Sequence, residues 1–114
     1  MKILDWKHDK EDIQYTIGRM NPKYLIGLYL KAKKSAHSVV HKYMEADGTD
    51  YETAKDTAFK TVRESVHYDG VTFQMSLKTI KDELNRRIEI GQIICDPTAT
   101  TNKTRYTVNK SYNK

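Results

Sequence analysis

The sequence predicts a mainly α-helical α+β domain that ends in a β-hairpin. Two observations predict this class. Three segments carry apolar residues at helical spacing, each of them directly behind a capping residue. The last helical segment is followed by a glycine and by two short β-forming runs around a polar loop. With 114 residues and one cysteine, the chain can bury a core without disulfides. We expect one domain over residues 1–114, with an N-terminal segment (1–20), a helical part (21–75), a helix-and-hairpin part (76–109) and a tail (110–114).

The first twenty residues predict a short strand. Ile13, Tyr15 and Ile17 alternate with polar residues, and Gly18 follows them. We expect Trp6 to pack on the core. Charged residues come at once after Met1 and no apolar run is long enough for secretion or for a membrane span. We therefore expect a cytoplasmic protein that does not bind a membrane.

A long helix is predicted to begin at Asn21-Pro22 and to end at Gly48, because asparagine caps a helix start and proline needs no N–H there. Its apolar side is formed by Leu25, Leu28, Tyr29, Ala32, Ala36, Val39, Val40 and Tyr43. On its basic side, with Lys23, Lys34 and His41, a solvated face is favoured over contact with a nucleic-acid backbone. His37 and His41 are one turn apart, but no third ligand is evident and we expect no metal.

A second helix, about Asp50 to Val66, is predicted from a capping box formed by Thr49 and Glu52. We expect it to bury Tyr51, Ala54, Ala58, Phe59, Val62 and Val66. Asp69-Gly70 predicts a turn. Val71, Phe73 and Met75 alternate with polar residues and predict a strand after it.

The third helix is predicted to begin at Ser76, which can accept a backbone N–H. Its apolar stripe is formed by Leu77, Ile80, Leu84 and Ile88, and Gly91 supplies a left-handed exit. Ile93–Cys95 and Tyr106–Val108 are predicted strands on either side of a polar loop from Asp96 to Thr104. In this pattern we expect Cys95 to pack rather than to react.

Residues 76–109 resemble the C-terminal half of the winged helix-turn-helix superfamily, in which a recognition helix is followed by a β-hairpin wing. The matching positions are Ser76, Thr79, Ile80, Leu84, Gly91, Ile93, Tyr106 and Val108. Arg87 stands where a second leucine is usual, and we expect Ile88 to take over its packing. The resemblance covers about a third of the chain and implies a three-helix winged-helix-like domain. It also requires that the segment of about nine residues from His67 to Met75 acts as an expanded, strand-like turn between the second and third helices.

The charge pattern favours a polyanionic partner. The net charge is +5, and the excess lies in residues 21–46 and 76–114. A helix and a ribbon with a basic tip suit a DNA duplex, because cations and hydroxyls contact phosphates while asparagine and arginine can read bases. The residues expected to bind DNA are Lys78, Thr79, Lys81, Asn85, Arg86, Thr101, Lys103 and Arg105. Asp82 and Glu89 share the helix face, so a solvated face with an i,i+4 pair between Lys78 and Asp82 is the alternative.

We therefore expect a small DNA-binding protein that regulates transcription or replication, with a homodimer as one possible form. The alternative is a non-enzymatic interaction adaptor, such as a small phage-type factor that binds and modulates a host enzyme, because fold does not fix function. No glycine-rich phosphate loop, paired carboxylates or Ser/His/Asp arrangement is recognisable. We expect neither enzymatic activity nor a cofactor.

Overall fold

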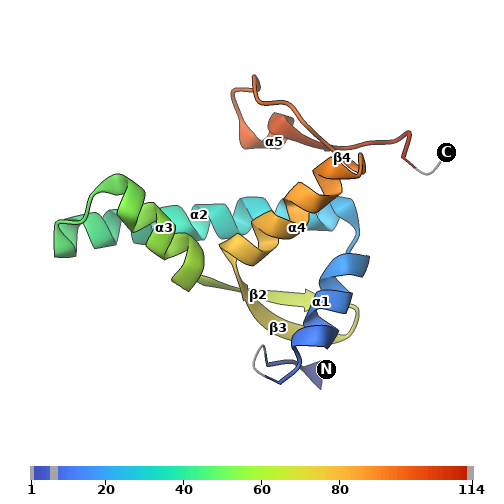
Figure 1. The fold of residues 1–114 in the computed structure, drawn as a ribbon, viewed down its shortest axis with the longest axis horizontal. Helices are drawn as coiled ribbons and strands as arrows, with labels where there is room; N and C mark the ends of the chain where they lie inside the picture. The colour runs from blue at the N-terminus through green and yellow to red at the C-terminus, as the bar shows by residue number, and fades with distance from the viewer. Residues whose placement is uncertain (1, 6–7, 113–114) are drawn as a thin grey trace.

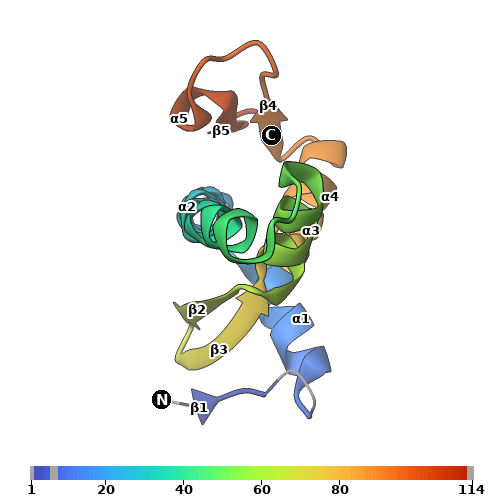
Figure 2. The same ribbon diagram turned by 90° about the vertical axis from the view of Figure 1, so that its left-hand side faces the viewer.

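The computed structural model describes residues 2–5 and 8–112, with the backbone alone at residues 2, 102 and 103. It is a mixed α+β structure, which confirms the predicted class. Figures 1 and 2 show α2, α3 and α4 between a three-stranded sheet at one end of the molecule and a two-stranded ribbon at the other. The molecule is flat, with extents of 51 × 39 × 19 Å. The elements are β1 (Lys2–Ile3), α1 (Lys10–Arg19), α2 (Pro22–Asp47), α3 (Tyr51–Thr61), β2 (Arg63–Tyr68), β3 (Val71–Ser76), α4 (Leu77–Glu89), β4 (Ile93–Cys95), α5 (Asn102–Arg105) and β5 (Tyr106–Val108).

Residues 10–19 form the helix α1, so the prediction of a strand there was wrong. Ile13, Thr16 and Ile17 are buried, and Tyr15 is 67% exposed. The burial therefore follows a helical period of three to four residues rather than an alternation of two. An ion pair between Arg19 and Asp69 joins the end of α1 to the turn of the β2–β3 hairpin. The predicted packing of Trp6 lies outside the described residues.

The helix α2 agrees with its prediction at both ends. The Asn21 side chain accepts from the Lys23 N–H at 2.9 Å, and Pro22 is the first helical residue. Gly48 ends the helix with a φ of +62°, a backbone conformation that glycine adopts at little cost. The predicted apolar side forms part of the core.

The second predicted helix ends earlier than expected. Helix α3 stops at Thr61, and residues 63–68 form the strand β2. Val66 is buried as predicted, but from a strand. The capping box was also misplaced by one residue, because the Asp50 side chain, and not Thr49, accepts from the Thr53 N–H.

Strands β1, β3 and β2 form one sheet in that order, with β1 parallel and β2 antiparallel to β3. Tyr68 pairs with Val71, so Asp69 and Gly70 form a two-residue turn. Both have positive φ, +53° and +77°, as a type I′ turn requires. Helices α3 and α4 are thus joined by a β-hairpin that starts at Arg63, rather than by the expanded turn His67 to Met75 that the resemblance required.

Helix α4 and the ribbon after it agree with the prediction. Ser76 Oγ accepts from the Thr79 N–H at 3.3 Å, and Gly91 leaves the helix with a φ of +86°. The N–H of Gly91 donates to Ile88 and that of Gln92 to Arg87, which is the Schellman arrangement. Strands β4 and β5 pair antiparallel. The loop between them differs from the prediction in containing the short helix α5.

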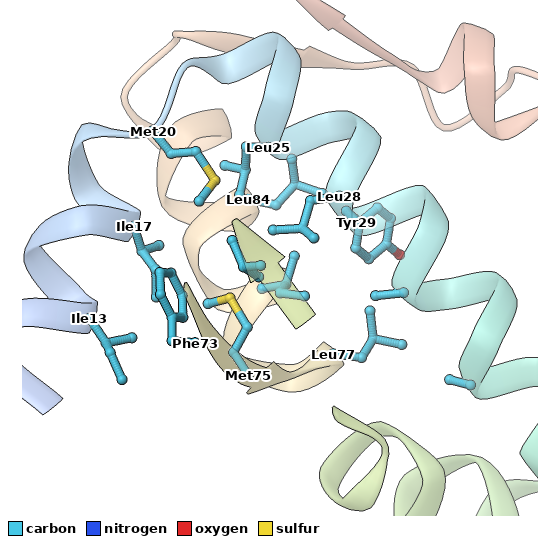
Figure 3. Packing of buried hydrophobic residues seen from close by; sticks show 14 of the residues in the cluster. Ile13, Ile17, Met20, Leu25, Leu28, Tyr29, Phe73, Met75, Leu77 and Leu84 are labelled. Atoms are coloured by element: carbon cyan, nitrogen blue, oxygen red, sulfur yellow. The ribbon is translucent and has the colours of Figure 1, made fainter. Parts of the chain in front are cut away.

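The core lies where α1, α2, β3 and α4 meet. Figure 3 shows Ile13 and Ile17 of α1 close to Phe73 and Met75 of β3, with Leu84 of α4 nearby. On the other side of α2, Tyr106 brings the ribbon onto the helices. The ribbon is therefore attached to the same core as the helices and has a defined place over α2 and α4.

Candidate nucleic-acid interface

Lys81 is a residue of α4, and its side chain contacts α2 and β5. Its Nζ donates to the hydroxyls of Tyr106 at 3.0 Å and Tyr29 at 3.4 Å, and lies 4.8 and 5.3 Å from the ring centroids of Tyr29 and Tyr106. The two rings meet edge to face at 5.5 Å. Burial alone would lower the pKa of Lys81, but its interactions with the two tyrosines raise that pKa above its usual value. The charged ammonium therefore holds the ribbon on the helices.

The exposed cations of α4 form ion pairs within the helix. Lys78 contacts Asp82 at 3.1 Å, and Arg86 contacts Glu83 at 2.6 Å. Burial would raise the pKa of Glu83, but the hydrogen bonds from Arg86 and Arg87 outweigh it and lower that pKa. The predicted alternative of i,i+4 pairing is thus observed for Lys78 and Asp82, and these cations are partly neutralised.

The outer side of α4 is also flanked by α1. A hollow of about 430 Å³ separates the two helices and is lined by Lys10, Gln14, Ile17, Thr79, Asp82, Glu83 and Arg86. The hydroxyl of Thr79 lies 3.1 Å from that of Ser76. Asn85 is exposed on the same helix. A duplex approaching α4 would therefore meet α1 beside it.

At the ribbon tip, the predicted residues mostly contact their own loop. The hydroxyls of Thr101 and Thr104 lie 2.9 Å apart, and Arg105 Nη2 donates to the Ala99 carbonyl at 3.2 Å. Arg105 is half-buried, and its Nε has no hydrogen-bond partner among the described residues. The side chain of Lys103 lies outside the described part of the chain.

The structure brings together a set of basic side chains that the sequence analysis did not group, and two of them, Lys33 and Lys55, were not named there. We call it the basic cluster, and it consists of Lys33, His37 and His41 on α2, Lys55 on α3, Lys81 on α4 and Arg105 at the end of α5. No carboxylate of the described residues forms an ion pair with its lysines or its arginine. On α2 the spacing 33, 37, 41 is visible in the sequence. The sequence does not show that α3 and the ribbon bring Lys55 and Arg105 towards these residues.

The electrostatics of the basic cluster show that these charges act on one another. Burial lowers the pKa of Lys33, and Arg105, Lys81 and Lys55 lower it further against an opposing effect of Tyr106. The pKa of His37 is lowered by burial and then by Lys33, Lys55 and His41. Lys33, Lys55 and Lys81, which form no ion pair with a carboxylate of the described residues, therefore lie where α2, α3 and α4 meet. Arg105 at the ribbon adds a further charge, which also acts on the Asp96 carboxylate.

The structure also bears on the predictions for Cys95 and for the histidine pair of α2. Cys95 is half-buried and packs against the core, as expected. Among the described residues no three His, Cys, Asp or Glu side chains are grouped closely enough to hold a metal, and His37 and His41 have no third ligand there.

Two further results do not concern the candidate interface itself. No helix in residues 2–5 and 8–112 has both the length and the apolar character needed to span a membrane. No family model, no curated protein and no solved structure matches the chain significantly.

Proposed function

We propose that the protein binds duplex DNA through its basic cluster, with the winged-helix-like unit of α4 and the ribbon placed over the phosphate backbone. The observation that carries this proposal is the concentration of cations without carboxylate partners in the cluster. Like charges repel at short range, and the phosphates of a duplex would relieve that repulsion while releasing counterions.

The proposal places the phosphate contacts differently from the helix-and-wing pattern alone. Lys78 and Arg86 already have carboxylate partners, and Lys81 is held by two tyrosines. Lys33 and Lys55 have none among the described residues. Arg105 and the ribbon would lie beside them, and Asn85 would remain for contact with a base. Binding of this kind positions a protein on DNA with little dependence on sequence.

The test compares two double variants that remove the same charge. K33Q/K55Q removes two cluster lysines, and K60Q/K78Q removes two lysines that pair with Asp56 and Asp82. Binding to a fluorescent duplex of about 25 base pairs is measured by anisotropy at about 0.1 M salt. We expect K33Q/K55Q to bind at least about tenfold more weakly and K60Q/K78Q to bind within about twofold of the unmodified protein. Equal effects of the two double variants would show that only net charge matters and would contradict the proposed interface.

A role as a protein-interaction adaptor is the second candidate. The observation that favours it is a pair of exposed apolar side chains where α4 leads into the ribbon, Ile90 at 44% and Ile94 at 49% exposure. Such a pair can contribute to a protein interface. In pull-downs with and without nuclease, a partner that survives nuclease treatment and is lost with I90D/I94D would favour the adaptor over DNA binding.

A further inference from the structure

The strand β4 has an outer edge with backbone groups that are not used within the ribbon. Among the described residues β4 pairs with β5 alone. The Asp96 N–H, directly after β4, donates to the Arg105 carbonyl at 2.8 Å, and hydrogen-bonded pairs alternate along an antiparallel ladder with pairs that are not hydrogen-bonded. Ile93 and Cys95 therefore direct their N–H and carbonyl groups away from β5. No backbone group outside the ribbon bonds to them in the described part of the chain.

This edge lacks the features that usually protect an edge strand. Natural edge strands are often charged, interrupted by proline or very short, or they are covered by another element. Strand β4 consists of two isoleucines and a cysteine, with neither a charge nor a proline. Ile93 is buried, and Ile94 on the opposite face of the ribbon is 49% exposed. The edge of β4 is therefore uncharged and has an accessible apolar side chain beside it.

The other outer strands differ from β4 in this respect. In the three-stranded sheet, β1 has two residues, and β2 contains the charged residues Arg63 and Glu64. The His67 carbonyl of β2 also accepts a hydrogen bond from the Tyr24 hydroxyl of α2 at 2.9 Å. Strand β5 lies against α2 through the ring of Tyr106. Among the described strands, β4 is thus the one whose edge is best suited to pair with a further strand.

A second copy of β4 fits this edge by symmetry. In an antiparallel arrangement centred on Ile94, Ile93 of one copy faces Cys95 of the other, and their outward N–H and carbonyl groups bond on each side of a twofold axis. Ile94 then faces Ile94 of the second copy at the closely spaced position, with the Cα atoms about 4.5 Å apart. The two side chains leave water together. No charge on β4 meets a like charge, although the whole chain carries a net charge of +5.

We propose that the protein forms a twofold dimer in which β4 pairs antiparallel with β4 of a second copy, so that the two ribbons join into one sheet of the order β5-β4-β4-β5. The pairing involves three residues from each strand. Such an interface is small and of the transient class, so we expect a dissociation constant of about 10 to 100 µM. The dimer uses a different surface from the basic cluster, and it gives the exposed Ile94 a partner of its own kind.

The first experiment is sedimentation equilibrium of the full chain without DNA, at about 5 to 300 µM protein. I94K places two lysines opposite each other at the twofold axis, where like charges destabilise a strand pair. The control I3K makes the same change at an isoleucine of β1 that is 79% exposed. We expect the unmodified protein and I3K to approach twice the monomer mass of 13.3 kDa. I94K should have a dissociation constant at least about tenfold higher, and circular dichroism checks that all three proteins are folded.

A second experiment tests the register of the pairing and does not depend on the stability of I94K. In I94C/C95S the two introduced thiols face each other across the axis, at a Cα separation of about 4.5 Å that a disulfide can span. The matched control is I3C/C95S. Under a mild oxidant at about 100 µM protein, we expect I94C/C95S to form the linked dimer at least about tenfold faster than I3C/C95S, because only its thiols are held together by the pairing.

Several results would overturn the dimer. They are an unmodified protein that stays monomeric up to about 300 µM, an I94K variant that dimerises as well as the unmodified protein, and equal rates of disulfide formation in the two cysteine variants. Association beyond a dimer would also overturn it, because a twofold pairing of two edges is closed. None of these results bears on DNA binding, which is tested separately with the variants of the basic cluster.

Discussion

The guanidinium of Arg87 joins three elements in the interior. Its side chain is 3% exposed. It donates to the carbonyls of Ile17 at 2.9 Å and Gly18 at 3.1 Å, to Gln92 Oε1 at 2.6 Å and to Glu83 at 3.0 Å. The last carbonyls of a helix have no partner within that helix. Arg87 therefore satisfies the end of α1 and holds it against α4 and the residue that leads into β4.

Replacing Arg87 by methionine should lower the free energy of unfolding by about 3 kcal/mol. Methionine fills much of the space, but the carbonyls of α1 and the Glu83 carboxylate lose a charged donor in a place with little water. The measurement is urea unfolding at neutral pH. The control is R86M, which removes the half-exposed partner of the same glutamate and should cost less than about 1 kcal/mol. Equal losses in the two variants would show that Arg87 has no special role in the interior.

The sequence shows that Arg87 departs from an apolar pattern, but not why. Its partners Ile17 and Gly18 are 70 and 69 residues earlier in the chain, and no local rule connects them. Ile88 was expected to take over the packing of a leucine, and it does pack against the core, while Arg87 is buried beside it.

At the scale of elements, most boundaries that depend on nearby residues were predicted, although the capping box at Thr49 was one residue off. Boundaries that depend on contacts distant in the sequence were not predicted. Asn21, Ser76 and Gly91 act on backbone groups a few residues away, so their effect is readable from neighbouring letters. Strand β2 is different, and it was predicted as the end of the second helix. Val62 and Val66 continue the four-residue spacing of Ala54 and Ala58, so the apolar pattern alone looks helical. What makes it a strand is its pairing with β3, in which Val66 faces Phe73.

Two glycines in different surroundings, Gly70 in the β2–β3 turn and Gly27 within α2, give predictions of opposite sign. Gly70 has a φ of +77°, where a side chain is strained, so G70A should lower the free energy of unfolding by about 1 to 2 kcal/mol. Gly27 lies within α2, and a Cβ there meets no atom within 4 Å. G27A should therefore raise the free energy of unfolding by about 0.5 to 1 kcal/mol. Thermal and urea unfolding of both variants check the opposite signs, and a loss in both would mean that the backbone at Gly27 is constrained in some other way.

At the scale of the whole molecule, the positive charge open to a partner depends on which side chains form ion pairs, and not only on how many charges a segment carries. Counting charges along the chain placed the positive excess in residues 21–46 and 76–114, and the basic cluster draws most of its residues from these segments. The count could not show that Arg86 is neutralised by Glu83, nor that Lys55 joins the cluster from an acidic segment. The first fact is a pairing within α4, and only the second depends on how α3 packs on α2. Together they are why the predicted interface on α4 differs from the one proposed on the cluster.

The number of phosphates contacted by the cluster can be counted from the salt dependence of binding. For a protein on B-DNA, each neutralised phosphate contributes about −0.9 to the slope of log affinity against log salt concentration. K33Q and K55Q should each reduce the steepness of this slope by about 0.9, and K33Q/K55Q by about 1.8, because the two lysines lie on different helices and would contact separate phosphates. Affinities between about 50 and 300 mM salt give the slopes, and K60Q, whose lysine pairs with Asp56, should leave the slope unchanged. If K33Q/K55Q weakened binding without changing the slope, Lys33 and Lys55 would support the fold of the interface but would not contact the phosphates.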